Sequence, residues 1–220
     1  MAPPFDLLPA LLRGAGLTVA LTLAAGLLGL VLSFVVGLAR LSPARPIRAI
    51  TTSYVELFRG TSALVQLFLF FYVLPRFGLE LPALLTGALA LGLNTGAYGS
   101  EIVRGAILAV DKGQREAATA LNLRPATAMR RIILPQALPA MLPPFGNLLV
   151  ELLKGTSLVS LITLTELAFA GRQLAVGVGR VGEVYALVLI LYFVLTYPIM
   201  LVTRRIERRV QRHDVPFRPA

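Results

Sequence analysis

Charged side chains within long apolar runs are the residues of this sequence most able to do chemistry. Glu101, Glu151 and Glu166 could act as a general acid or base, and Lys154 could supply a counter-charge. Enzymatic use would require a nucleophile pair or a set of metal ligands beside them. The sequence has no cysteine, and its one histidine, His213, lies in the polar tail. We therefore expect no metal, no cofactor and no catalysis in this chain.

Glu151 and Lys154 are the pair best suited to meet a solute. One helical turn separates them, and Thr156 and Ser157 follow shortly after. A charge at membrane depth is costly unless it faces a cavity or a partner, and this pair offers both signs one turn apart. These four residues are our candidates for the lining of a translocation pathway. A purely structural ion pair between the first two is an equal alternative.

The composition places these residues in a membrane. Of the 220 residues 56% are hydrophobic and only 15% are charged, and the mean hydropathy is +0.78, which is too apolar for a soluble domain of this size. The formal net charge of +10 could indicate a nucleic-acid partner. The basic residues, however, stand between apolar runs of about twenty residues, so the charge reflects membrane topology and no nucleic acid is expected.

Five apolar runs are long enough to cross the hydrocarbon core, and they predict an all-α integral membrane protein with one domain, residues 1–220. The predicted spans are residues 14–39, 50–74, 81–109, 136–157 and 184–203. Pro139, Pro143 and Pro144 predict broken or kinked turns in the fourth span.

The distribution of arginine and lysine predicts the orientation. The basic segments 112–131 and 204–218 should both face the cytoplasm, so an even number of spans must separate them. Residues 157–182 are semi-polar and are expected to fold back at the outer surface. Residues 1–13 lack the features of a secretory signal and are expected to be a mature amino terminus. The amino terminus is therefore predicted outside and the carboxyl terminus in the cytoplasm.

Short spacings within the spans predict local contacts. Glu101 and Arg104, at i and i+3, are expected to pair on one helix face near the cytoplasmic side, where they could transmit motion. Glu56 and Arg59 are expected to pair at a helix end. Three glycines of the first span would allow a neighbouring helix to approach closely: Gly26, Gly29 and Gly37.

A polar, arginine-bearing loop, residues 111–135, interrupts the apolar runs after the third span. Good helix formers predict a short helix over residues 116–123. Arg124-Pro125 then restarts the chain, because proline fits the first turn of a helix. A second short helix is predicted over residues 126–133, ended by Pro135.

This loop resembles the cytoplasmic loop of permease subunits from ATP-driven (ABC) importers, which reads E-A-A, three residues, G, nine residues, I, any residue, L-P. Its counterparts here, preceded by Gly113, are Glu116, Ala117, Ala118, Asn122, Ile132, Leu134 and Pro135. Asn122 replaces the family's glycine, and asparagine is the next residue to tolerate a left-handed turn. The resemblance implies the five-helix type I importer fold in the inner membrane of a bacterial cell, with this loop coupling it to an ATPase.

The resemblance also implies partners. The sequence contains no Gly-x-x-x-x-Gly-Lys-Ser/Thr phosphate loop, so ATP binding by that motif must occur elsewhere. A separate ATP-binding cassette subunit is expected to dock on the loop. A second permease subunit, identical or homologous, is expected to complete the pathway, and an extracytoplasmic solute-binding protein to deliver the solute.

Three further blocks resemble the polar amino acid uptake branch of these permeases, the group of histidine and glutamine importers. They read E-L-F-R-G-T at 56–61 with L-V-Q at 64–66, S-E-I-V-R-G at 100–105, and L-L-K-G-T-S-L at 152–158. The resemblance implies a polar amino acid or a similar small zwitterionic solute as cargo. Gly155 stands where the branch commonly has an acid, so a compatible solute with fixed charges is a second candidate.

The residues alone leave other functions open. An amphipathic helix on the anionic inner leaflet would explain the arginines of the loop but not its neutral Glu-Ala-Ala face. A secondary transporter or channel would normally use more spans, inverted repeats or carboxylates suited to ion coupling. An intramembrane enzyme would need catalytic partners for its glutamates.

Overall fold

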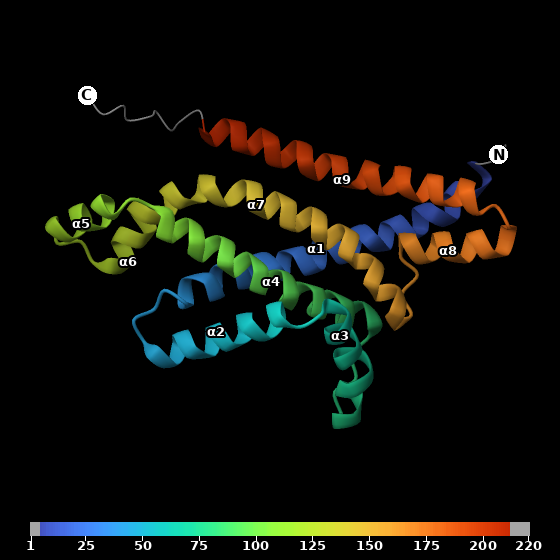
Figure 1. Cartoon of the computed structure of the whole chain (residues 1–220), viewed down its shortest axis with the longest axis horizontal. Coiled ribbons are helices and arrows are strands. Elements are labelled where there is room, and N and C mark those ends of the chain that lie inside the picture. Colours follow the sequence, from blue (N-terminus) through green and yellow to red (C-terminus); the bar gives the residue numbers. More distant parts are fainter. Residues whose placement is uncertain (1–4, 212–220) are drawn as a thin grey trace.

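The structure is a computed structural model that describes residues 5–211, and every regular element in that range is helical (Figure 1). The α-helices are α1 Leu8–Ala39, α2 Arg45–Gly60, α3 Ala63–Phe68, α4 Ala83–Ala109, α5 Lys112–Ala120, α6 Pro125–Ala128, α7 Leu134–Gly155, α8 Leu167–Val178 and α9 Val181–Gln211. Short 3-10 turns cover Phe5–Leu7, Leu74–Phe77 and Thr156–Ile162, and π-helical turns cover Leu69–Val73 and Met129–Ile133. The predicted all-α fold is confirmed. The predicted start at Met1 and the tail residues Arg212 and His213 lie outside the described range.

Four long helices, α1, α4, α7 and α9, lie along the long axis of the molecule (Figure 1). The short helices α5 and α6 form one end, and α8 lies at the other end beside the start of α1. Buried apolar clusters occur at both ends and between them. Leu11 packs with Leu167 and Val184 at the α8 end, and Ile107 packs with Ile133 at the α5 end. The core therefore runs along the whole length of the described helices.

Helices α1 and α4 approach each other closely through glycine. A Cβ atom on Gly37 would lie 2.8 Å from Cβ of Val103, and one on Gly29 would lie 2.9 Å from Cγ2 of Thr95. These contacts confirm the predicted close approach of a neighbouring helix at both positions. A Cβ on Gly26 would instead meet Leu149 of α7, at 3.3 Å from its Cδ1 atom.

Within residues 5–211, three helical segments are long and apolar enough to cross a membrane, namely Phe5–Ala39, Pro125–Ile162 and Val181–Arg208. A fourth arises if the bent pair Arg45–Gly60 and Ala63–Phe77 counts as one span. Helix α4 is not among them, although at 27 residues its length is about 40 Å. Its buried residues face protein, which relaxes the need for apolar side chains. The five-span count remains a prediction.

The predicted second span, residues 50–74, contains a sharp bend, because the helical segments Arg45–Gly60 and Ala63–Phe77 meet at an angle of 104°. Thr61 and Ser62 have extended backbone, and α2 ends at Gly60. The carbonyl of Phe58, near the end of α2, then accepts hydrogen bonds from Nε2 of Gln66 at 2.9 Å and from Nδ2 of Asn94 at 3.1 Å. These amides satisfy a carbonyl of the helix end and fix the bend.

The fourth predicted span also differs from its prediction. Helix α7 runs without a break from Leu134 to Gly155 with Pro139, Pro143 and Pro144 inside it. The irregular turns lie at its two ends instead, in the π-helical turn Met129–Ile133 and the 3-10 turn Thr156–Ile162. The three prolines therefore lie within a continuous helix and do not end it.

Glu166, considered above as an acid or base, has a structural role. It is fully buried, and its two carboxylate oxygens accept the backbone N–H groups of Ala168 and Phe169, each at 2.8 Å, so it caps the start of α8. The hydroxyl of Tyr192 donates to it from α9 at 3.0 Å. At the same end Nη1 of Arg180 meets Oδ2 of Asp6 at 3.0 Å.

Candidate functional site

The loop after α4 forms two short helices at one end of the molecule (Figure 1). Helix α5 begins at Lys112, because the carboxylate of Asp111 accepts the backbone N–H of Gly113 at 2.7 Å and caps it. It ends at Ala120, so the predicted bounds, residues 116–123, lie too far along the chain. The helix exists where the sequence predicts one, displaced towards α4.

Asn122 adopts the left-handed conformation that the sequence predicts, with φ of 52°. Beside this turn the N–H of Leu123 donates to the carbonyl of Ala118 at 3.0 Å. Arg124 then caps α6 with extended backbone, and Pro125 occupies its first turn. The predicted restart at Arg124-Pro125 is confirmed.

The second short helix does not end at Pro135. Helix α6 passes into the π-helical turn Met129–Ile133, which joins α7 directly. Pro135 lies in the first turn of α7. The loop therefore continues into a long helix without a hinge, and Ile132 and Leu134 are half-buried on it.

The small residues of the loop face opposite ways. Gly113, Glu116 and Ala117 are exposed, whereas Ala118 is only 3% exposed and faces its own chain. Ala118 lines a pocket together with Ile107 of α4 and with Ala128 and Ile133 of the following turns. Of the two alanines of the Glu-Ala-Ala motif, only Ala117 is therefore exposed on the surface of this chain. Sequence analysis missed Leu121, which is 71% exposed at the tip of the loop.

Two side-chain contacts fasten the loop to the long helices. Nη2 of Arg115 donates to the carbonyl of Ile107 in the last turns of α4, at 2.6 Å. Nε2 of Gln136 on α7 donates to Oε1 of Gln114 at 3.2 Å. These two hydrogen bonds join α5 to α4 and α7.

Glu151 lines a cavity of about 230 Å³ between α3, α4 and α7. Asn94, Thr95 and Tyr98 of α4 line it too, and among its lining residues Glu151 is the one with a charge. Sequence analysis missed the three α4 residues, whose spacing places them on one helix face. Further lining residues are Ala63, Leu91, Leu148, Leu152, Gly155 and Leu158.

The other three pathway candidates do not gather there. Lys154 is exposed, does not line this cavity, and forms no ion pair with Glu151 within the described chain. Thr156 is fully buried, and its hydroxyl donates to the carbonyl of Leu153 at 2.7 Å. Ser157 is half-buried in the 3-10 turn. The structural ion pair between Glu151 and Lys154, one of the two alternatives left open by the sequence, is therefore not formed within the described chain.

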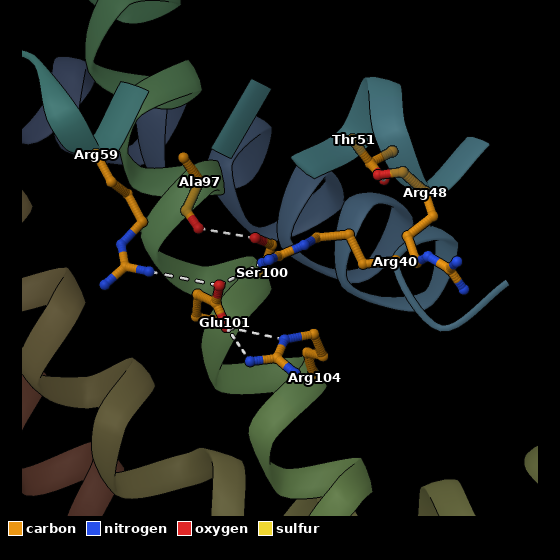
Figure 2. Close-up of polar contacts among 8 residues, drawn as sticks. All are labelled: Arg40, Arg48, Thr51, Arg59, Ala97, Ser100, Glu101 and Arg104. Atoms are coloured by element: carbon orange, nitrogen blue, oxygen red, sulfur yellow. Dashed lines mark hydrogen bonds and ion pairs between the residues drawn. The ribbon is translucent and has the colours of Figure 1, made fainter. Parts of the chain in front are cut away.

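Glu101 of α4 lies at the centre of three arginines (Figure 2). Its Oε2 atom accepts from Nε and Nη2 of Arg104, each at 2.9 Å, which confirms the predicted pair. Its Oε1 atom meets Arg40, at the end of α1, and Nη1 of Arg59 at 3.4 Å. Arg59 also lies over the ring of Tyr98, with Cζ 5.3 Å from the ring centroid. The predicted pair of Arg59 with Glu56 is wrong.

Comparison with known proteins relates this arrangement to membrane transport. The chain is 47% identical over 213 residues to a probable amino-acid ABC transporter permease protein, y4tF, of Sinorhizobium fredii, covering 94% of this chain and 90% of the relative. It is 37% identical to the L-cystine transport system permease protein TcyB of Bacillus subtilis, covering 96% and 93%, and 34% identical to the glutamine transport system permease protein GlnP of Escherichia coli, covering 93% and 94%.

A solved structure has the same fold. A chain of an amino acid ABC transporter crystallised with histidines superimposes with a TM-score of 0.86 at 36% identity, covering 95% of this chain and 100% of that one. The MetNI methionine ABC transporter shares the fold, with a TM-score of 0.77 at 23% identity. The family described as the binding-protein-dependent transport system inner membrane component matches residues 25–212, which contain the helical loop, the Glu101 cluster and the cavity. The chain belongs to this family, as a multi-pass permease subunit of the inner membrane.

Proposed function

We propose that this permease carries a polar amino acid with a single positive charge at its ammonium group. The observation that carries the proposal is the cavity between α3, α4 and α7, which has one carboxylate, Glu151, among neutral polar groups. Cavities that bind small solutes are mostly apolar with a few placed polar groups. The amino acid importers among the relatives support the same class of cargo.

Gly155 narrows the class of solute that the cavity would suit. It lines the same cavity as Glu151, and no heavy atom lies within 4 Å of a Cβ built on it. An acidic side chain at this position, as in the resembling branch, would add a second carboxylate beside the first. The cavity here has one, which suits the ammonium of a zwitterion better than the two positive charges of a basic amino acid.

Uptake by the reconstituted complex, with its ATPase and binding protein, tests this cargo. We expect Glu151→Gln to lower uptake of the preferred amino acid at limiting concentration by about tenfold, because a hydrogen bond to a charged group contributes about 1.5 kcal/mol. The matched control is Lys154→Met, on the next turn of α7 and outside the cavity. It should change uptake by less than about twofold.

The panel of solutes should include neutral and basic amino acids, a quaternary ammonium compatible solute and a sugar. Preferred uptake of the sugar would contradict the cargo class, and preferred uptake of the compatible solute would assign the cavity to a fixed cation instead. Equal uptake by the Glu151→Gln variant and the wild type would remove Glu151 from the pathway.

The partners proposed from the sequence remain an ATP-binding cassette subunit, a second permease subunit and an external solute-binding protein. The exposed face of α5, with Glu116 and Ala117, and the exposed Leu121 at the loop tip form the proposed docking surface of the ATPase. An apolar tip beside small and charged residues suits a groove on another protein. The proposed role of this permease is non-catalytic.

The proposed topology has five spans, with the start of α1 outside and the end of α9 in the cytoplasm. Its support is the position of α5 at one end of the long helices and of α8 at the other (Figure 1), together with the arginines of the loop and of α9. A reporter active only in the cytoplasm, fused after Arg208, should be active. An inactive reporter there, with an active one after Gly179, would reverse the orientation.

A further inference from the structure

The bend between α2 and α3 forms part of the wall of the cavity that contains Glu151. Ala63, the first residue of α3, lines that cavity together with Asn94 of α4. Gln66 holds the bend from the α3 side, because Nδ2 of Asn94 donates to its Oε1 atom at 3.1 Å. Any movement of the bend therefore changes access to the cavity.

Arg59 ties the last turn of α2 to α4 immediately before this bend (Figure 2). Its Nη1 atom lies 3.4 Å from Oε1 of Glu101, and its guanidinium covers the ring of Tyr98. Tyr98 lines the same cavity as Ala63. The position of Arg59 is thus linked to the cavity both through the bend and through the Tyr98 ring.

The three arginines around Glu101 are held unequally. Arg104 is on the same helix and makes two contacts of 2.9 Å, and the side chain of Arg40 is only 12% exposed. Arg59 makes the longest contact and its side chain is 42% exposed, so solvent weakens its attraction to the carboxylate. When Arg59 leaves, the other two arginines still neutralise Glu101. Of the three arginines, Arg59 therefore needs the least free energy to separate from Glu101.

The carboxyl-terminal end of α4, just beyond Glu101, is attached to the loop that is proposed to meet the ATPase. Arg115 donates to the carbonyl of Ile107, on the helix that carries Glu101. A shift of α5 therefore moves α4, and with it Glu101, relative to α2. The contact between Glu101 and Arg59 joins two elements that such a shift would separate.

We propose that Arg59 is a releasable latch, whose separation from Glu101 frees the α2–α3 bend and opens the cavity wall at Ala63 when the coupling loop moves α4. Arg59 acts as a positioning residue in this role, because it holds the bend and not the solute. The biological role of this latch rests on the proposed transport function. The contact and its effect on access to Ala63 can be measured independently of the cargo.

The absence of cysteine from this sequence allows a direct measurement. Ala63→Cys gives the permease a single labelling site in the complex with its ATPase, and the rate of labelling by a hydrophilic methanethiosulfonate reagent reports access to the cavity wall. Without ATP, we expect Arg59→Gln to raise that rate about two- to fivefold, the range of an exposed ion pair. The matched control is Arg104→Gln, which removes a guanidinium from the same carboxylate without touching α2 and should leave the rate unchanged.

A second variant separates loss of the latch from loss of the fold. Arg59→Lys keeps the charge and should restore slow labelling. Labelling of Arg59→Gln at the parent rate, or labelling of Arg59→Lys as fast as that of Arg59→Gln, would overturn the latch. Uptake measured on the same samples separates the two proposals: faster labelling of Arg59→Gln, with no amino acid taken up by the Ala63→Cys parent, would support the latch and contradict the cargo.

Discussion

Gly99→Ala is expected to lower the stability of the permease by about 1–3 kcal/mol, because it forces a methyl group into the contact between α1 and α4. The new Cβ would lie 2.0 Å from Oγ of Ser33 and 3.0 Å from Cε1 of Phe145. Ser33 is fully buried, and its hydroxyl donates to the carbonyl of Gly29 at 2.6 Å, so it cannot turn away without losing that bond. The midpoint of thermal unfolding in nanodiscs should fall by about 2–12 °C.

Gly105→Ala on the same helix is the matched control. No heavy atom lies within 4 Å of a Cβ built on Gly105, so the change adds a better helix former without a clash. Its unfolding midpoint should stay level or rise. If both variants lost stability equally, the effect would come from replacing glycine in α4 in general, and the close contact with Ser33 would not explain it.

The sequence correctly predicted those features that depend on residues close together in the chain. Asn122 and Pro125 each impose a backbone geometry on their own position, and both behave as predicted. The same holds for Glu101 and Arg104, which are one turn apart on α4. The site in the loop could therefore be recognised before its three-dimensional form was known.

Contacts between distant residues decide the rest. Arg40 is 61 residues from Glu101, and Gln66 is 28 residues from Asn94. No short sequence spacing therefore predicts the three-arginine cluster or the bend between α2 and α3. The sequence shows that Arg104 lies near Glu101, but it does not show that folding also brings Arg40 and Arg59 to the same carboxylate. The cavity around Glu151 was missed in part for the same reason, since α3, α4 and α7 each contribute to it.

Ala118→Asp is expected to detach the coupling loop from α4. Ala118 is 3% exposed, and burial of even a neutral polar group there without a partner costs about 1–3 kcal/mol, with more for an ionised carboxylate. Arg115, one turn earlier, donates from Nη2 to the carbonyl of Ile107, and a carboxylate at position 118 would compete with that carbonyl for the guanidinium. Both the burial cost and this competition are expected to loosen α5. The rate at which trypsin cleaves the loop after Lys112 or Arg115, in the permease alone, should rise about tenfold for a loss of 1.4 kcal/mol.

Ala117→Asp is the control that distinguishes between detachment of the loop from the long helices and loss of ATPase binding. Ala117 is the preceding residue of α5 but is exposed, so its aspartate stays in water and the rate of tryptic cleavage should remain that of the wild type. Co-purification of the ATPase with each variant adds the second measurement. We expect both variants to lose the ATPase, with an unchanged tryptic rate in Ala117→Asp and a raised rate in Ala118→Asp. The reason is that Ala117 is exposed on the proposed docking surface, whereas Ala118 is buried within the chain. Equal tryptic rates in the two variants would show that burial of Ala118 does not hold the loop, and the attachment would then rest on Arg115 and Gln136.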